Sequence, residues 1–171
     1  KAGGVRIANT LGSAETTARY MLEEGLITSQ TGSERAIVES VLVEECLQIS
    51  EELYLAMTID GSLKRIVAIS SRAGGMDIEE VAHHSPKSIF VEPIDPSLGL
   101  LSYQSRNMAY KLNIPEILVR PFVQLTQDLY SAFINTDASL AEINPLVITS
   151  NNTIMAADAK LDLDDDALFR H

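Results

Sequence analysis

The feature that most limits how this chain can fold is the stretch from Glu142 to Lys160, in which two apolar runs flank the polar residues 150–153. Apolar runs joined by a short turn of Ser, Asn and Thr predict a β-hairpin. Asn144 lies on the first predicted strand and Asp158 on the second. Because antiparallel partners lie roughly 5 Å apart across a ladder, we expect the two side-chain oxygens to converge.

One amide oxygen and one carboxylate form a sparse set of ligands. Such a set suits Mg²⁺, which keeps several waters and takes its remaining ligands from substrate phosphates. The hairpin therefore predicts a metal site for nucleotide chemistry at Asn144 and Asp158. The alternative is a turn at Asn144 and Pro145 and a solvated edge residue at Asp158, and the pattern alone leaves both interpretations open.

Composition excludes several classes of protein. A chain of 171 residues fits one domain or two small lobes and can bury a substantial core. Although 46% of the residues are hydrophobic, no apolar run approaches the roughly 20 residues of a membrane span. The net charge of −11 is scattered along the chain, so the surface should repel nucleic acid and anionic membranes. We expect a soluble protein with neither as a partner.

The single cysteine, Cys46, lies in an apolar run and has no partner within the chain. A disulfide framework is thereby excluded, and a reducing compartment is predicted: the cytoplasm, or the mitochondrial matrix in a eukaryote. Since no histidine lies near it in the sequence, we interpret Cys46 as a small buried hydrophobic residue and not as a nucleophile.

The remaining apolar patterns predict a mixed α+β fold with a predominantly antiparallel sheet. Strands are expected at residues 5–8, 36–47, 53–59, 64–70 and 88–91, with a polar turn at 28–34. Helices are expected at residues 14–24, 102–112 and 117–133, with a short helical or irregular segment at 76–82 and a closing helix capped by the aspartates near residue 164. The dipeptide Asp60-Gly61 should join two antiparallel strands. In the longest helix the predicted core stripe is Leu118, Phe122, Leu125, Leu129 and Phe133, and Pro121 is expected near the first turn.

Three further acids are candidates for a nucleotide site. Glu44 is expected at the end of a buried strand and Glu52 just before the next one, where carboxylates can accept hydrogen bonds from ribose hydroxyls. Glu142 lies two residues before Asn144 on the same predicted strand face and should border the phosphate site. Solvated loop acids, or a buried salt bridge for Glu142, are the alternatives. The adjacent His83 and His84 point to opposite sides of any regular element, so a shared metal is not expected.

Taken together, several separated motifs resemble the β subunits of succinyl-CoA synthetase, and the resemblance spans nearly the whole chain. The motifs occur in the family's order with compatible spacing, and malate-CoA ligase β subunits share the same pattern. The residues that carry the resemblance are Lys1–Val5, Leu42–Glu44, Glu51–Leu55, Gly74–Glu79, Glu142–Leu146, Asp158–Lys160 and Ala167–Arg170.

The resemblance implies an ATP-grasp fold and a ligase that joins a dicarboxylic acid to CoA with cleavage of ATP or GTP. By that likeness Asn144 and Asp158 match Mg²⁺ ligands, and Glu44 and Glu52 match nucleotide contacts. Position 47 also borders the nucleotide in the family, and Leu47 could offer only its backbone there. Glu142 matches an acid near a phosphorylated histidine that belongs to a partner α subunit, in an αβ or α2β2 assembly. None of this chain's histidines, including His171, is then expected to accept the phosphoryl group.

Two departures from the family pattern concern the ends. We expect residues 1–171 to be a fragment of an ATP-grasp domain, with the phosphate-binding loop cut just before Lys1 and a CoA-ligase domain beyond His171. Such a fragment should be inactive alone, and CoA should bind mainly outside it. Other ATP-grasp acid-CoA ligases, such as an ADP-forming acetyl-CoA synthetase or a citrate-cleaving enzyme, remain open, as does a non-catalytic assembly module.

Overall fold

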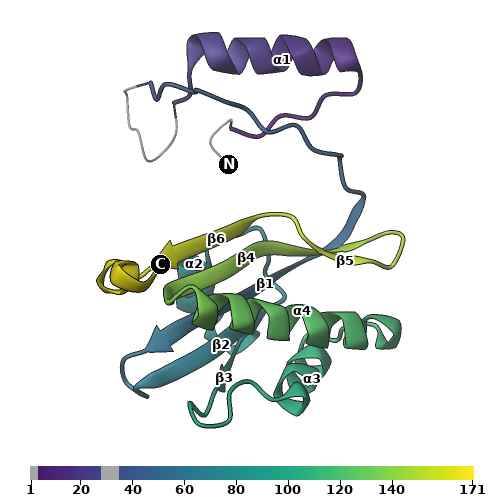
Figure 1. The fold of residues 1–171 in the computed structure, drawn as a ribbon. Coiled ribbons are helices and arrows are strands. Elements are labelled where there is room, and N and C mark those ends of the chain that lie inside the picture. The colour runs from purple at the N-terminus through teal and green to yellow at the C-terminus, as the bar shows by residue number, and fades with distance from the viewer. Residues whose placement is uncertain (1–3, 28–34) are drawn as a thin grey trace. The chain divides into compact units, whose positions relative to one another are not determined.

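A computed structural model describes residues 4–27 and 35–171 (Figure 1). The chain divides into two compact units, residues 1–47 and residues 48–171. The turn predicted at residues 28–34 and the first three residues of the Lys1–Val5 motif lie outside the described residues. None of the described helices is long and apolar enough to cross a membrane.

The first unit contains helix α1 (Leu11–Glu24), close to the predicted helix. Its start is fixed by a reciprocal pair of bonds: Ser13 N donates to Thr10 Oγ1, and Thr10 N donates to Ser13 Oγ, both at 3.1 Å. The helix ends at Gly25, whose φ of 66° is open to glycine at little cost. The strand predicted at residues 5–8 is wrong, because this segment is irregular and Val5 and Ile7 are exposed.

The buried strand predicted at residues 36–47 is also wrong. The segment is irregular except for one bridge between Ala36 and Leu26, and Leu42 and Val43 are exposed. Cys46 is exposed as well, which contradicts its prediction as a buried residue. β-branched composition favours a strand only where a neighbouring strand can complete the ladder. Within the described part of this unit, the Leu26–Ala36 bridge is the only such pairing.

The second unit is built on a six-stranded sheet (Figure 1). Five strands follow the order β3-β2-β1-β4-β5, and the sixth, β6, also pairs with β4, next to the segment of β4 that pairs with β5. Every described pairing is antiparallel, which confirms the predicted α+β fold class. The strands are β1 (Ile49–Asp60), β2 (Arg65–Ser71), β3 (Ile89–Pro93), β4 (Ala138–Thr149), β5 (Ile154–Ala156) and β6 (Ala159–Leu163).

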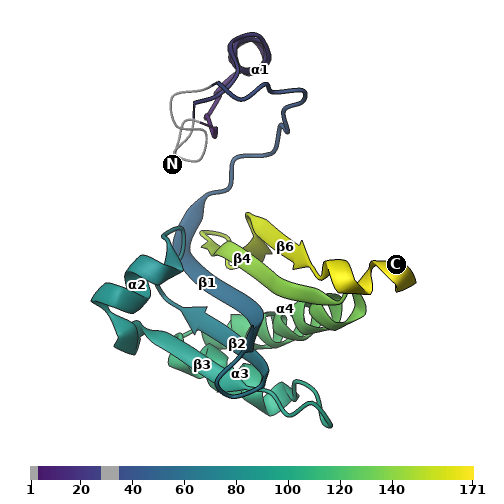
Figure 2. The same ribbon diagram turned by 90° about the vertical axis from the view of Figure 1, so that its left-hand side faces the viewer.

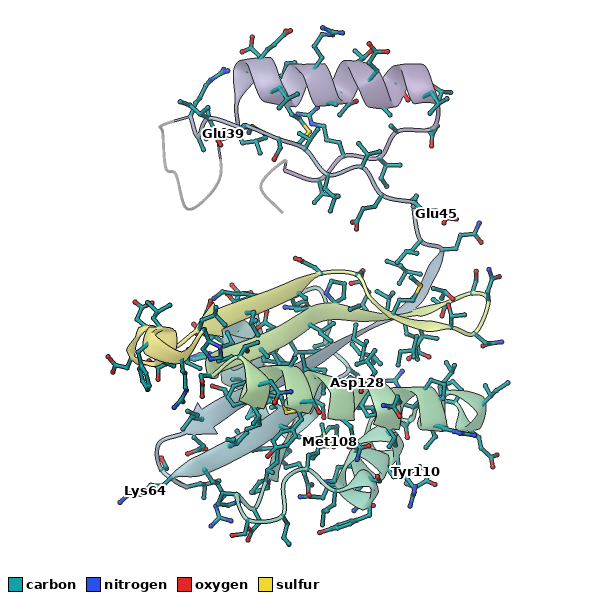
Figure 3. All side chains as sticks on the ribbon, viewed as in Figure 1. Glu39, Glu45, Lys64, Met108, Tyr110 and Asp128 are labelled. Atoms are coloured by element: carbon teal, nitrogen blue, oxygen red, sulfur yellow. The ribbon has the colours of Figure 1, made fainter. Side chains whose placement is uncertain are left out.

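The hairpin predicted at Asp60-Gly61 is confirmed. Asp60 and Arg65 are the last paired residues of β1 and β2. The Asp60 carboxylate accepts hydrogen bonds from Ser62 N at 2.8 Å and Leu63 N at 2.9 Å, which stabilises the turn. Lys64 marks the end of this turn (Figure 3).

Two helices, α3 (Ser102–Lys111) and α4 (Glu116–Asn135), pack against one side of the sheet (Figure 2). The predicted stripe of α4 is confirmed: Leu118, Phe122 and Phe133 are buried, and Leu125 and Leu129 pack against the core. Met108 of α3 lies in the same layer (Figure 3). On β1 the core residues are Leu53, Leu55 and Met57, which alternate as in a strand with one face on the core.

Pro121 lies inside α4 and not in its first turn, because the helix begins directly after Pro115. The proline is exposed, so its ring sits on the solvent side of the helix.

The remaining elements are short. Helix α2 (Ile78–His84) lies on the far side of β1 from α4 (Figure 2) and is followed by the 3₁₀ turn η1 (Pro86–Ser88). The chain closes with the 3₁₀ helix η2 (Asp165–Arg170). Asp164 caps η2 by accepting a hydrogen bond of 3.0 Å from Asp166 N, as predicted for these aspartates.

The predicted hairpin near the carboxy end is confirmed, with one difference in its second strand. β4 pairs with both β5 and β6, and the break between them falls at Ala157 and Asp158. Opposite this break, β4 carries a bulge. Leu53 pairs with Leu146 and Leu55 with Ile143, so that Tyr54 alone faces Asn144 and Pro145. The extra residue keeps both Ile143 and Leu146 in the helix-side core and removes Asn144 from the regular ladder.

Candidate functional site

The side chain of Asn144 is fixed by the loop that follows β2. Gly75 N donates to Asn144 Oδ1 at 2.7 Å, and Asn144 Nδ2 donates to the carbonyl oxygen of Met76 at 2.9 Å. These two bonds define which end of the amide is oxygen. A carbonyl oxygen has two lone pairs, so Oδ1 keeps one acceptor position for a further partner.

The loop can approach the sheet because it contains two glycines. Gly74 runs beside β1, where its N–H donates to the Glu52 carbonyl at 3.2 Å. A Cβ atom at Gly74 would lie 2.3 Å from Leu53 N and 2.5 Å from the Glu52 carbonyl carbon, which leaves no room for any side chain. Gly75 has a φ of 67°, a conformation that glycine adopts readily.

Glu142 lies on the sheet face away from α3 and α4. It stands in register with Ala56 of β1 on one side and Lys160 of β6 on the other. Its Oε2 atom is 2.8 Å from the hydroxyl of Tyr54. Among the described residues the alternative of a buried salt bridge is wrong, because no lysine or arginine pairs with Glu142 and its neighbour Lys160 pairs with Asp162 at 2.9 Å.

Tyr54 is the residue of this site that sequence reasoning missed. Its side chain is buried, and this burial raises the pKa of the phenol well above its usual value. The hydrogen bond to Glu142 and the negative charges of Glu142 and Asp77 raise that pKa further. The available signal was the alternation on β1: Leu53, Leu55 and Met57 share the core face, which places the hydroxyl-bearing Tyr54 on the same face of the sheet as Glu142.

Asp158 lies across the ladder from Asn144, with its own carbonyl oxygen accepting a bond from Asn144 N at 3.0 Å. The break between β5 and β6 leaves Asp158 exposed and outside both strands. Within the described residues no group of three His, Cys, Asp or Glu side chains could hold a metal ion. Any ion between Asn144 and Asp158 would therefore depend on water and on oxygen atoms of a ligand.

The predicted nucleotide contacts are distributed over both units. Glu44 is exposed and Leu47 is partly buried, and both belong to the first unit. Glu52 belongs to the second unit, where it is exposed on β1 and pairs with Val147.

The histidines lie outside this group of residues. His83 and His84 are exposed in the last turn of α2, in agreement with their interpretation as surface residues. His171 and Arg170 both contact the Asp137 carboxylate, at 2.7 Å and 2.6 Å. The hydrogen bond from Arg170, and then that from His171, lower the pKa of Asp137 to about 2.

A family model and solved structures identify the class of protein to which this fold belongs. Residues 1–148 match the ATP-grasp domain family, and the chain belongs to this family. Among the solved structures that share the fold are an acetyl-coenzyme A synthetase and an ATP citrate lyase. The acetyl-coenzyme A synthetase 1 of Ca. Korarchaeum cryptofilum matches 96% of this chain and 71% of its own, with a TM-score of 0.66 and 16% identity. The ATP citrate lyase of Methanothrix soehngenii matches 92% of this chain and 34% of its own, with a TM-score of 0.60 and 17% identity.

Curated relatives with higher identity carry one name. The chain is 46% identical over all 171 residues to the succinate–CoA ligase [ADP-forming] subunit beta of Desulfatibacillum aliphaticivorans. It is 44% identical over the same length to the protein of that name from Geobacillus kaustophilus. In both cases the chain spans 44% of the relative's length.

Proposed function

We propose that this chain is part of the β subunit of a succinate–CoA ligase and contributes to its nucleotide and phosphoryl-transfer site. The carrying observation is the identity of 44–46% along the whole chain with subunits of that name. In the proposed reaction a nucleoside triphosphate, succinate and CoA give succinyl-CoA, a nucleoside diphosphate and phosphate. The phosphoryl group would pass through a histidine of a partner α subunit.

Asn144 and Asp158 are the proposed Mg²⁺ ligands. Three features support this assignment: the two residues are neighbours across the β4–β6 region, Asn144 Oδ1 retains an acceptor position, and the Asp158 side chain is exposed. When bound, Mg²⁺ would neutralise charge on the phosphate oxygens and act as a Lewis acid. The protein would contribute by holding the Asn144 side chain in place through its bonds to Gly75 and Met76 before the nucleotide binds.

Glu142 is the proposed catalytic carboxylate, and it would lie beside the phosphohistidine of the α subunit. Its side chain is partly exposed, Oε2 accepts a hydrogen bond from Tyr54, and no other described residue bonds to the carboxylate. Glu44, Glu52 and the backbone of Leu47 are the proposed nucleotide contacts. CoA would bind mainly outside residues 1–171.

The proposal is tested with the full-length β chain and its α partner, because the present chain spans less than half of its relatives. Formation of the CoA thioester is measured with succinate or malate and with ATP or GTP, in the presence of Mg²⁺. We expect thioester with succinate in preference to malate. Absence of thioester with any acid, while nucleotide still binds, would favour a non-catalytic assembly module.

The Asp158→Ala variant tests the metal site within the same assay. Turnover should fall about a hundredfold or more, because the variant loses a ligand of the Mg²⁺ ion that would stabilise negative charge on the phosphates. The thermal midpoint should stay close to that of the wild type, because Asp158 is exposed. Asp128→Ala is the matched control, because Asp128 is exposed on α4 and contacts Gln124 (Figure 3). Equal loss of folding and activity in Asp158→Ala would count against a role in metal binding.

A further inference from the structure

We propose that Tyr54 is a positioning residue that holds the Glu142 carboxylate in its reactive orientation. This inference rests on the proposed function, because it requires Glu142 to act in phosphoryl transfer. It adds a residue on a different strand, 88 positions earlier in the sequence, that acts only through Glu142.

The hydrogen bond between the two side chains has one direction. A carboxylate offers only acceptors, so the Tyr54 hydroxyl donates to Glu142 Oε2 across 2.8 Å. Hydrogen bonds to charged groups are among the stronger ones, and this one restricts rotation of a flexible glutamate side chain. Oε2 is thereby occupied and Oε1 remains available to a reacting group.

The other neighbours of Glu142 do not orient its carboxylate. Among the described residues, Tyr54 is the only donor to the Glu142 carboxylate. Ala56, the β1 neighbour in register, has no polar group in its side chain, and Lys160 is paired with Asp162. Without the phenol, the Glu142 side chain would be free to take other rotamers.

The position of Tyr54 in the sheet links it to Asn144. Tyr54 is the β1 residue that faces the two-residue bulge of Asn144 and Pro145 on β4. The ring is buried and its backbone is in register with Ser71 of β2, so the surrounding packing restricts the movement of the hydroxyl that contacts Glu142. A tyrosine with its ordinary pKa of about 10 is protonated at neutral pH, and burial, followed by the hydrogen bond to Glu142, raises the pKa of Tyr54 further, so the phenol serves as a donor and not as a base.

The experiment is a double-mutant cycle in the full-length β chain assembled with its α partner. Tyr54→Phe, Glu142→Gln and the double variant are compared for kcat, for KM of the nucleotide and for transfer of label from γ-labelled ATP to the α subunit. Tyr54→Phe should lower kcat and the labelling rate about tenfold, because one charge-assisted hydrogen bond is lost, and leave KM within about twofold. In the Glu142→Gln background the same change should have no further effect.

Tyr110→Phe is the control, because Tyr110 projects from α3 and is exposed (Figure 3). It should leave kcat unchanged. An active wild type with an unaltered Tyr54→Phe variant would overturn this inference alone, as would losses that multiply fully in the double variant. An inactive wild-type complex would overturn the proposed function, and this inference with it.

Discussion

Gly75 donates its backbone N–H to the side-chain oxygen of Asn144 across 2.7 Å, and this bond joins residues 69 positions apart in the sequence. A second bond, from Asn144 Nδ2 to Met76, makes the asparagine a two-point support for the loop between β2 and α2. Asn144, which is proposed to bind Mg²⁺, therefore also holds the Gly75–Met76 loop in place beside the proposed metal site.

The Asn144→Ala variant should loosen this loop. Removing the amide leaves the partly buried Gly75 N–H without its acceptor, at a cost of about 1–3 kcal/mol in the free energy of unfolding or of local opening. Hydrogen exchange of the Gly75 amide, followed by NMR, measures the effect. Asn144→Asp should retain most of the protection because a carboxylate oxygen can still accept from Gly75. Unchanged exchange in the alanine variant would contradict the role of Asn144 as a support.

Gly74→Ala should displace the same loop by steric exclusion. The added Cβ would lie 2.3 Å from Leu53 N, so the backbone must shift, at a cost of about 1–3 kcal/mol measured by chemical denaturation. Gly61→Ala is the matched control in the β1–β2 turn, where a Cβ has no neighbour within 4 Å. It should change the free energy of unfolding by less than about 0.5 kcal/mol. Similar effects of the two substitutions would show that space at Gly74 does not limit the loop.

Stability should fall at alkaline pH because of Tyr54. Its pKa is raised in the folded protein, so the unfolded chain loses the phenolic proton first. The contribution is fully present below the ordinary tyrosine pKa of about 10 and is lost as pH rises from there towards the folded value. Denaturation midpoints between pH 9 and 11.5 measure this slope. Tyr54→Phe should have a shallower slope than the wild type, whereas Tyr110→Phe should match it.

Ser105→Ala should stabilise the second unit. The hydroxyl of Ser105 is fully buried in α3 and has no hydrogen-bond partner among the described residues. Removing an unpaired buried polar group and adding a better helix former should raise the free energy of unfolding by about 1 kcal/mol. The exposed Ser131, whose hydroxyl donates to the Gln127 carbonyl, provides the control, and Ser131→Ala should be nearly neutral. Destabilisation of the Ser105→Ala variant would indicate a partner for that hydroxyl.

The correct sequence-based predictions concern elements whose pattern is local. The spacing of Leu118, Phe122 and Phe133 predicts α4 and its buried side, and Asp60-Gly61 predicts the turn between β1 and β2. Such patterns can be recognised within a short segment, because the helical and strand periods decide which nearby side chains share a face. The resemblance to known β subunits agrees with the family match over residues 1–148.

The errors arise where a pattern needs a distant partner. The apolar segment at residues 36–47 reads as a strand, but one bridge at Ala36 is its only described pairing, and Cys46 is exposed. Composition describes what a segment can bury and not whether another part of the chain will cover it.

The sequence by itself determined the α+β class, the position of the β4 hairpin and the residues Asn144, Glu142 and Asp158 as candidates. Only the tertiary structure decided that Tyr54 contacts Glu142 and that Gly75 contacts Asn144. The physical reason is the bulge in β4. One additional residue changes which side chains share a face, and this shift depends on pairing between strands more than 80 residues apart.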